Sequence, residues 1–338
     1  MFTVTPKQTY EEVLACIQAG LVANVVSSPG IGKSAIAAQI AKDFRLKLID
    51  IRLSQCTPED LNGYPMRNGD KATFRPFDIF PIEGDSIPQG YDGWLLFFDE
   101  ITSAGKAVQA AAYKILLDHM IGSFKLHPNV AMMAAGNKST DKAVVNSMST
   151  ALQSRMIHFE MVPDHNEFTE YAIKNDLDHR IIGFINYMPS RLMDFRPDHQ
   201  DKTFACPRTW EFLSRLIKNK EVSNKIGARI AGTIGQGVAV EFITFAEEYS
   251  RLPKFRDITT SPTTAQIPSE SSTKYATMSM LIENFDEHSL DKVIQYIERF
   301  DIEMQIIFCR GAVVRNPKIR SEHKKFGEYL TKMVRYLQ

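Results

Sequence analysis

The chain has 338 residues, of which 44% are hydrophobic and 24% are charged. This composition excludes a disordered or fibrous protein and is sufficient for about two domains with hydrophobic cores. Forty Lys and Arg balance forty Asp and Glu. No net charge therefore steers the whole molecule towards nucleic acid or an anionic membrane, so any nucleic-acid contact would have to be local.

The cysteines indicate a reducing compartment. They are far apart and form no C-x-x-C pair, which favours buried thiols over disulfides or a zinc site: Cys16, Cys56, Cys206 and Cys309. No apolar run approaches the roughly 18 residues of a membrane span, and the first residues lack the order of a signal peptide. We therefore expect a cytoplasmic protein without a membrane segment.

The first half of the chain alternates helical and strand patterns. Thr5, Pro6 and Gln8 predict the capped start of a helix that ends at Gly20. A second helical pattern covers residues 34–44. Short apolar runs predict five strands, over residues 21–26, 46–53, 94–98, 130–135 and 156–161. This alternation predicts an α/β fold with a parallel sheet and helices on both faces.

Beyond Pro163 the pattern becomes helical. Helical spacing occurs in segments such as 166–174, 209–218 and 278–308. Gly235 and Gly237 predict a helix break, and residues 253–273, rich in Ser, Thr and Pro, predict a connector. We expect three parts: an α/β domain over 1–162, a helical domain over 163–252, and the connector with a mostly helical extension over 253–338.

The segment from Ser27 to Ser34, Ser-Ser-Pro-Gly-Ile-Gly-Lys-Ser, lies between a predicted strand and a predicted helix. Backbone N–H groups in such a loop face an anion. Lys33 would reach the β- and γ-phosphates of a nucleotide, and the Ser34 hydroxyl would coordinate Mg²⁺. The predicted nucleotide-binding residues are Pro29, Gly30, Ile31, Gly32, Lys33 and Ser34. Ser27 departs from the usual glycine, and Gly-Lys-Ser or Gly-Lys-Thr should appear by chance in roughly one chain in ten of this length.

Acidic residues end the strand predicted over 94–98. Asp99 would lie near Mg²⁺, and Glu100 would polarise a water for attack on the γ-phosphate. By itself such a pair is more often a solvated strand end, and the upstream phosphate loop favours the catalytic interpretation. Asn137, after the strand over 130–135, could orient the attacking water or could be a plain turn residue.

Two arginines offer further positive charge. Arg155 precedes the last predicted strand, and Arg208 opens a helix in the second half. An isolated arginine is usually a surface charge.

In this order, the motifs resemble those of the AAA+ ATPases, most closely the MoxR-like and dynein-related branch, over roughly residues 10–220. The corresponding motifs are a P-loop (Walker A) at Lys33, Walker B at Asp99 and Glu100, and sensor 1 at Asn137. The resemblance implies an arginine finger at Arg155, which reaches the nucleotide of a neighbouring subunit. It also implies that residues 163–252 form a lid, where Arg208 acts as sensor 2 in its own subunit.

The resemblance further implies a homo-oligomeric ring, usually a hexamer, that uses ATP and Mg²⁺. Residues 64–75, turning at Asn68-Gly69, resemble an inserted hairpin of the family, and residues 121–126 resemble the hairpin ahead of sensor 1. Two features depart from the branch: Lys138 stands where a proline is common, and Gln-Ser-Arg at 153–155 differs from the usual finger motif.

These features favour an ATP-driven protein remodeller or chaperone, and the family suggests a von Willebrand A-type protein as a partner. One alternative is a nucleic-acid motor or helicase loader, which the basic stretch 315–338 supports and the zero net charge opposes. Another is a nucleotide-dependent scaffold without turnover. The presence of Glu100, Asn137 and Arg155 argues against the scaffold.

Overall fold

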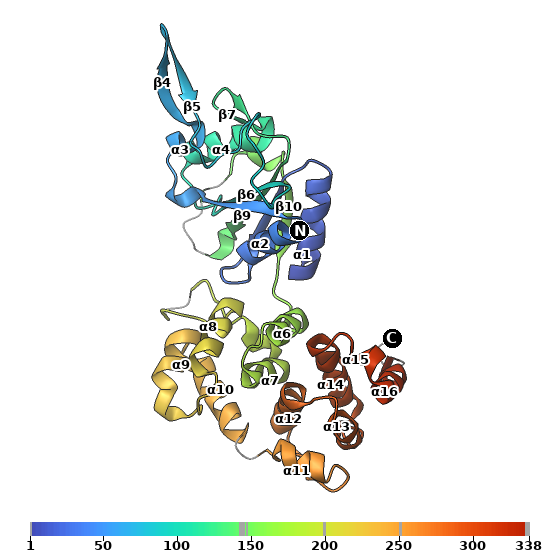
Figure 1. Cartoon of the computed structure of the whole chain (residues 1–338). Helices are drawn as coiled ribbons and strands as arrows, with labels where there is room; N and C mark the ends of the chain where they lie inside the picture. The colour runs from blue at the N-terminus through green and yellow to red at the C-terminus, as the bar shows by residue number, and fades with distance from the viewer. Residues whose placement is uncertain (1, 142–145, 147, 199–200, 250–251, 335–338) are drawn as a thin grey trace. The chain divides into compact units, whose positions relative to one another are not determined.

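The computed structural model describes residues 2–141, 146, 148–198, 201–249 and 252–334. The chain divides into two units: Met1–Pro163 with Arg196–His199, and Asp164–Phe195 with Gln200–Gln338 (Figure 1). The first unit contains a mixed sheet-and-helix core, and the second contains helices alone among its described residues.

A parallel sheet organises the first unit, which confirms the predicted α/β fold. Its strand order is β1-β10-β2-β9-β6-β3, and the bounds are β1 Thr3–Val4, β2 Ala23–Ser27, β3 Leu46–Arg52, β6 Gly93–Asp99, β9 Val130–Asn137 and β10 Ile157–Met161. The sequence predicted five of these strands and missed β1, which has only two residues. Because every pairing in this sheet is parallel, β2, β3, β6 and β9 end at the same edge.

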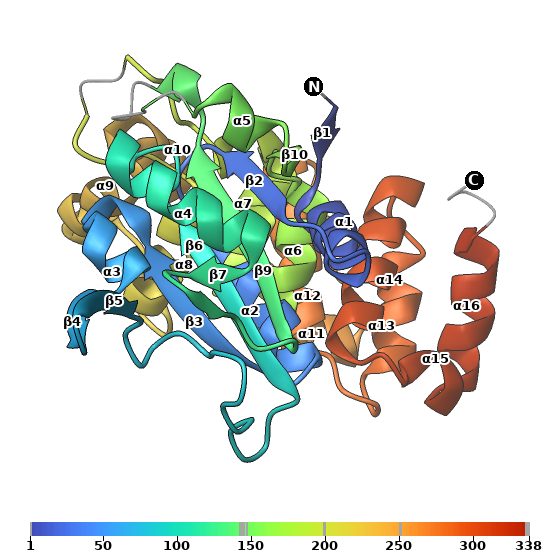
Figure 2. The same cartoon turned by 90° about the horizontal axis from the view of Figure 1, so that it is seen from above.

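Helices cover both faces of the sheet (Figure 2). Their bounds are α1 Pro6–Gln18, α2 Lys33–Asp43, α3 Pro58–Asn62, α4 Lys106–Asp118 and α5 Thr150–Gln153. On β6, Trp94, Leu96 and Phe98 pack into one core cluster with buried residues of α4. The alternate residues Leu95 and Phe97 are also buried, on the opposite face, because side chains alternate along a strand. Residues 93–98 of β6 are therefore buried on both faces, and the strand ends at half-buried Asp99.

The predicted first helix and both hairpins are present. Thr5 and Gln8 form the capping box of α1, and Gly20 closes the helix with φ +70°. One hairpin pairs β4 (Tyr64–Asn68) with β5 (Lys71–Arg75) and extends away from the sheet (Figure 1). The other pairs β7 (Met120–Ile121) with β8 (Phe124–Lys125).

The second unit is built from helices: α6 His165–Lys174, α7 His179–Tyr187, α8 Pro207–Ile217, α9 Gly227–Ile234, α10 Gln236–Tyr249, α11 Phe255–Thr260, α12 Ser271–Asn284, α13 Leu290–Ile297, α14 Ile302–Arg315, α15 Ile319–Glu322 and α16 Lys324–Val334. Gly235, with φ +87°, separates α9 from α10 as predicted. One expectation needs correction, because segment 278–308 is interrupted by two turns. The predicted connector 253–273 contains α11 and the start of α12.

Two hydrophobic clusters lie in this second unit. One centres on the aromatic side chains of Phe184, Trp210 and Phe242, and the other on those of Tyr296 and Phe308. Helix α12 contributes residues to both clusters. The division into a lid over 163–252 and an extension over 253–338 stays a prediction.

All four cysteines are free thiols, three of them buried and Cys56 half-buried. Within the described ranges, every helix falls short of the length and apolar character that a membrane span requires.

Candidate active site

The carboxyl end of β2 leads into the predicted loop, and α2 begins at Lys33. Gly30 and Gly32 adopt φ of +82° and +114°, a left-handed backbone that glycine enters without a steric cost. Half-buried Pro29 and buried Ile31 complete the turn. Gly32 is also the N-cap of α2. Glycine has no side chain that could accept hydrogen bonds from the N–H groups of the first helical turn. These N–H groups are therefore suited to an anionic ligand.

Lys33 connects the loop to the end of β9. Its Nζ donates hydrogen bonds to the Ser27 carbonyl at 3.2 Å, the Ser27 Oγ at 3.0 Å and the Asn137 Oδ1 at 3.1 Å. Ser27 and Asn137 are paired in register on neighbouring parallel strands, which explains why one ammonium reaches both. The departure from glycine at Ser27 thus supplies a hydroxyl that accepts from Lys33.

Ser34 and Asp99 lie together. The Ser34 Oγ donates to the Asp99 Oδ2 at 3.3 Å, and the other carboxylate oxygen accepts from the Glu100 N–H at 2.8 Å. A hydroxyl and a carboxylate are hard oxygen donors of the kind that Mg²⁺ takes. No group of three or more His, Cys, Asp or Glu in the described part of the chain could hold a metal. A cation here would therefore depend on phosphate oxygens as well.

Glu100 has a partner that the sequence did not reveal. The Ser54 Oγ donates a hydrogen bond to the Glu100 Oε2, from a 3-10 turn (Leu53–Gln55) directly after β3. Glu100 itself has φ +58°, a left-handed conformation that costs a non-glycine residue free energy and often occurs at functional sites. The signal that could have found Ser54 is its position at the end of a strand beside β6.

Negative charge accumulates at this edge of the sheet. Burial raises the pKa of the Asp50 carboxyl, Arg52 opposes the rise, and the charges of Asp99 and Glu100 add to it. Arg52 and Asp99 are paired in register on β3 and β6, and Arg52 lies 3.8 Å from the Asp50 carboxylate. An added cation would relieve the repulsion among these carboxylates.

Thr102 fixes the backbone of Asn137. Its Oγ1 accepts from the Asn137 N–H at 2.9 Å and donates to the Asn137 carbonyl at 3.2 Å. The preceding Gly136 allows this approach, because a Cβ there would lie 2.6 Å from the Thr102 side chain. The sequence reasoning missed Thr102, which follows Asp99-Glu100 by only two residues.

The two predicted arginines belong to different units. Arg155 is exposed on the first unit, and its guanidinium lies 5.1 Å from the centroid of the Tyr113 ring on α4, a cation–π contact. Arg208 is exposed near the start of α8 in the second unit. The structure thus brings together Lys33, Ser34, Asp99, Glu100 and Asn137, whereas the roles of both arginines stay predictions.

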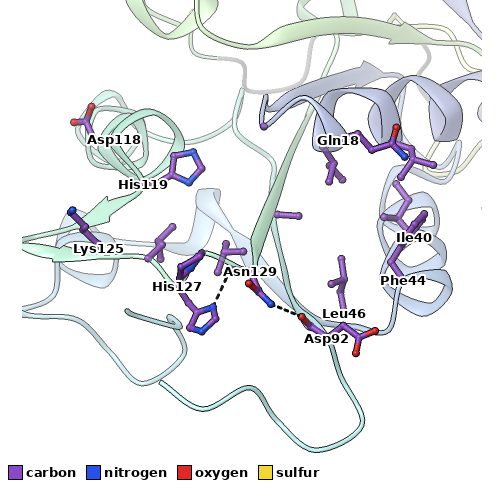
Figure 3. Close-up of a pocket in the computed structure, with 17 residues that line it drawn as sticks. Gln18, Ile40, Phe44, Leu46, Asp92, Asp118, His119, Lys125, His127 and Asn129 are labelled. Atoms are coloured by element: carbon purple, nitrogen blue, oxygen red, sulfur yellow. Dashed lines mark hydrogen bonds between the residues drawn. The ribbon is translucent and has the colours of Figure 1, made fainter. Parts of the chain in front are cut away.

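A cavity of about 690 Å³ lies at the opposite edge of the sheet (Figure 3). It is lined by Gln18 of α1, Phe44 and His119 just after α2 and α4, and Leu46 and Val130 at the starts of β3 and β9. Since the loop lies at the carboxyl ends of the strands, this cavity is separate from the candidate site.

The parallel sheet, the glycine loop between β2 and α2, and the acidic end of β6 define the first unit as a P-loop NTPase domain. Residues 24–163 match the family model described as "ATPase family associated with various cellular activities (AAA)". The matched residues include the glycine loop, the acidic end of β6 and Asn137, and the match ends where the second unit begins.

No curated protein matches the sequence. Among solved structures, a RuvB mutant from Thermotoga maritima is 16% identical with a TM-score of 0.36, and the alignment covers 97% of this chain and 88% of that one. An assumed ATPase from Cytophaga hutchinsonii is 13% identical with a TM-score of 0.38, over 98% of this chain and 90% of that one.

Proposed function

We propose that the chain is an ATP-hydrolysing AAA+ protein remodeller of the MoxR-like branch, acting as a homo-oligomeric ring of about six chains. The observation that carries the proposal is the convergence of five residues, from α2, the end of β6 and the end of β9, at one edge of the sheet: Lys33, Ser34, Asp99, Glu100 and Asn137. A scaffold that only binds nucleotide has no physical need for the water-activating pair Glu100 and Asn137.

Lys33 would be the main phosphate ligand. In the structure its ammonium is bonded to Ser27 and to the Asn137 side chain. Phosphate oxygens are charged acceptors and form stronger hydrogen bonds than a neutral carbonyl or hydroxyl. Binding of ATP would therefore draw Lys33 away from Asn137 and free the Asn137 amide oxygen for a water.

Ser34 and Asp99 would hold Mg²⁺. When bound, the cation neutralises charge that develops on the transferring phosphate. Asp99 is oriented for this by the Glu100 N–H, which occupies its second oxygen.

Glu100 would act as the general base. The carboxylate takes a proton from a water molecule while the oxygen of that water attacks the γ-phosphorus, and ADP leaves. Asn137, whose backbone is held by Thr102, would orient that water. Because Ser54 holds the Glu100 carboxylate, the side chain must release Ser54 before it reaches the water.

Arg155 would complete the site of a neighbouring subunit. Its exposure on the first unit leaves the guanidinium accessible to a second copy, where it would stabilise charge on the γ-phosphate. Arg208 would act on the nucleotide of its own subunit. We further propose a cytoplasmic location, which the free thiols support.

The experiment that tests this function measures ATP hydrolysis and oligomer size on the same purified protein. We expect Mg²⁺-dependent phosphate release and assembly to about six chains with ATP, detected by light scattering. ATP binding without turnover would favour the scaffold. Strong stimulation by single-stranded DNA would favour the nucleic-acid motor.

A partner screen tests the remodelling role. Glu100→Gln protein with bound ATP should retain a client or a von Willebrand A-type partner, whereas Lys33→Ala protein should not. Equal retention by both variants would contradict nucleotide-dependent binding of a client.

A further inference from the structure

Asn24 is an unexpected residue in the middle of the sheet. It lies on β2, three residues before Ser27, and its side chain is 0% exposed. A buried amide is unfavourable in an apolar layer unless its polar atoms find partners. The Asn24 Oδ1 has no hydrogen-bond partner among the described residues, so strand formation and core packing do not explain an asparagine here.

The other end of the amide contacts His158 on the neighbouring strand. Asn24 and His158 are paired in register between β2 and β10, with 3.1 Å between the Asn24 Nδ2 and the His158 Nδ1. The second ring nitrogen, Nε2, lies 2.7 Å from the carbonyl oxygen of Gln153. A carbonyl only accepts, so Nε2 is the donor to Gln153, and Nδ1 faces the Asn24 Nδ2, which only donates.

Gln153 is the last residue of α5 and precedes Arg155 by two positions. A four-residue helix has little stability of its own, because a single turn provides few hydrogen bonds for the order that it requires. Buried Leu152 and Met156 anchor the segment on one side. On the other side, the hydrogen bond from His158 holds the Gln153 carbonyl at the end of α5. This bond limits the directions in which the Arg155 side chain can project from the surface.

We propose that His158 is a positioning residue for Arg155: it links the buried Asn24 on the strand of the phosphate loop to the last carbonyl of α5. This inference rests on the proposed role of Arg155 as an arginine finger. His158 does not touch nucleotide in this scheme. It acts by holding the backbone from which the guanidinium projects, so its loss should lower turnover and leave nucleotide affinity unchanged.

Two amide substitutions separate this role from a general loss of packing. In His158→Gln the side chain is long enough to place an N–H donor where Nε2 lies, and its oxygen can accept from Asn24. In His158→Asn the amide still faces Asn24 but is too short to reach the Gln153 carbonyl. The two variants are matched in polarity and differ by one methylene, so each controls for the other.

The test measures three quantities on the full chain: amide hydrogen exchange over residues 149–156, ATP turnover, and affinity for a fluorescent ATP analogue. We expect faster exchange in His158→Asn but not in His158→Gln, since the Gln153, Ser154 and Arg155 N–H groups are bonded within this turn. Turnover should fall about tenfold in His158→Asn with affinity within about twofold of the parent, and His158→Gln should restore most of it.

The outcomes distinguish this inference from the proposed function. Exchange that is equal in the two variants and the parent overturns the positioning role, whatever the activities are. Faster exchange in His158→Asn, together with full turnover in Arg155→Ala, supports the link to the segment and contradicts the finger role. Loss of analogue affinity in His158→Asn would also overturn the inference, because it would show an effect on the subunit's own site.

Discussion

Ser54 donates a hydrogen bond to the carboxylate of Glu100. Ser54 lies just after β3 and Glu100 directly after β6, which are neighbouring parallel strands, and the two residues are far apart in sequence. The bond occupies one oxygen of the proposed general base and fixes the direction of its side chain. Hydrolysis would require this bond to open. Ser54 is therefore expected to restrain basal turnover, which is the ATP hydrolysis without a bound client protein.

Replacement of Ser54 tests this restraint. Ser54→Ala removes the donor and leaves the Glu100 carboxylate free to turn towards the water. A hydrogen bond to a charged group contributes roughly 1.5–3 kcal/mol, part of which is recovered from water, so we expect basal turnover to rise several-fold with unchanged ATP affinity. Ser54→Thr keeps a hydroxyl and is the matched control. Basal turnover that falls or stays constant in Ser54→Ala would contradict the restraint.

Loss of the Lys33 ammonium should weaken nucleotide binding. A charge-assisted contact contributes roughly 1.5–3 kcal/mol, so Lys33→Ala should lower ATP affinity tenfold or more. Calorimetric titration with ATP measures the change. Lys42→Ala, an exposed lysine near the other end of α2, is the control and should bind normally. Equal affinity in both variants would remove the phosphate-loop assignment.

A buried ion pair stabilises the second unit. Asp178 caps α7, and its carboxylate accepts three hydrogen bonds from Arg180. The guanidinium also donates to the carbonyls of Ile217 and Lys220. The side chains of Asp178 and Arg180 are only 2% and 11% exposed, respectively. Breaking such a pair leaves a buried charge, so Asp178→Asn should lower the free energy of unfolding by about 3 kcal/mol at neutral pH.

This loss should depend on pH. Burial alone would raise the pKa of Asp178, but the hydrogen bonds and charge of Arg180 outweigh it and lower the pKa. The stabilisation is therefore present above the ordinary carboxyl pKa of about 3.9 and is lost as the pH falls below it. Urea unfolding, followed by Trp210 fluorescence in a Trp94→Phe background, should show the two proteins converging in acid. A difference that stays constant down to pH 3 would contradict this account.

The sequence predicted the parts of the site that one local pattern encodes. The loop around Lys33 has its glycines, and Asp99 follows an uninterrupted apolar run. Ser54, Thr102 and the link from Asn24 to His158 were missed. Each depends on strand neighbours or on turns that bring distant residues together, and none carries a pattern of its own. The two turns within segment 278–308 were also missed, because the helical spacing of its apolar residues continues across them.

The proposed ring predicts complementation between two inactive variants. Arg155→Ala subunits should bind ATP but turn over on the order of 10³-fold more slowly, and Lys33→Ala subunits should not bind. In a mixture, Lys33→Ala subunits supply Arg155 to neighbours with a working loop, so some turnover should return. Arg208→Ala mixed with Lys33→Ala should recover nothing, because that defect stays in the only subunits that bind ATP. A silent Arg155 mixture of co-assembled subunits would refute the finger.

The most direct measurement of the central claim compares ATP binding with ATP turnover in Glu100→Gln. The amide keeps the shape of the side chain but cannot take a proton from water. We predict ATP affinity within about twofold of the parent and turnover lower by a factor on the order of 10²–10⁴, with Glu59→Gln, an exposed carboxylate on α3, unchanged. Near-normal hydrolysis in Glu100→Gln would contradict the account.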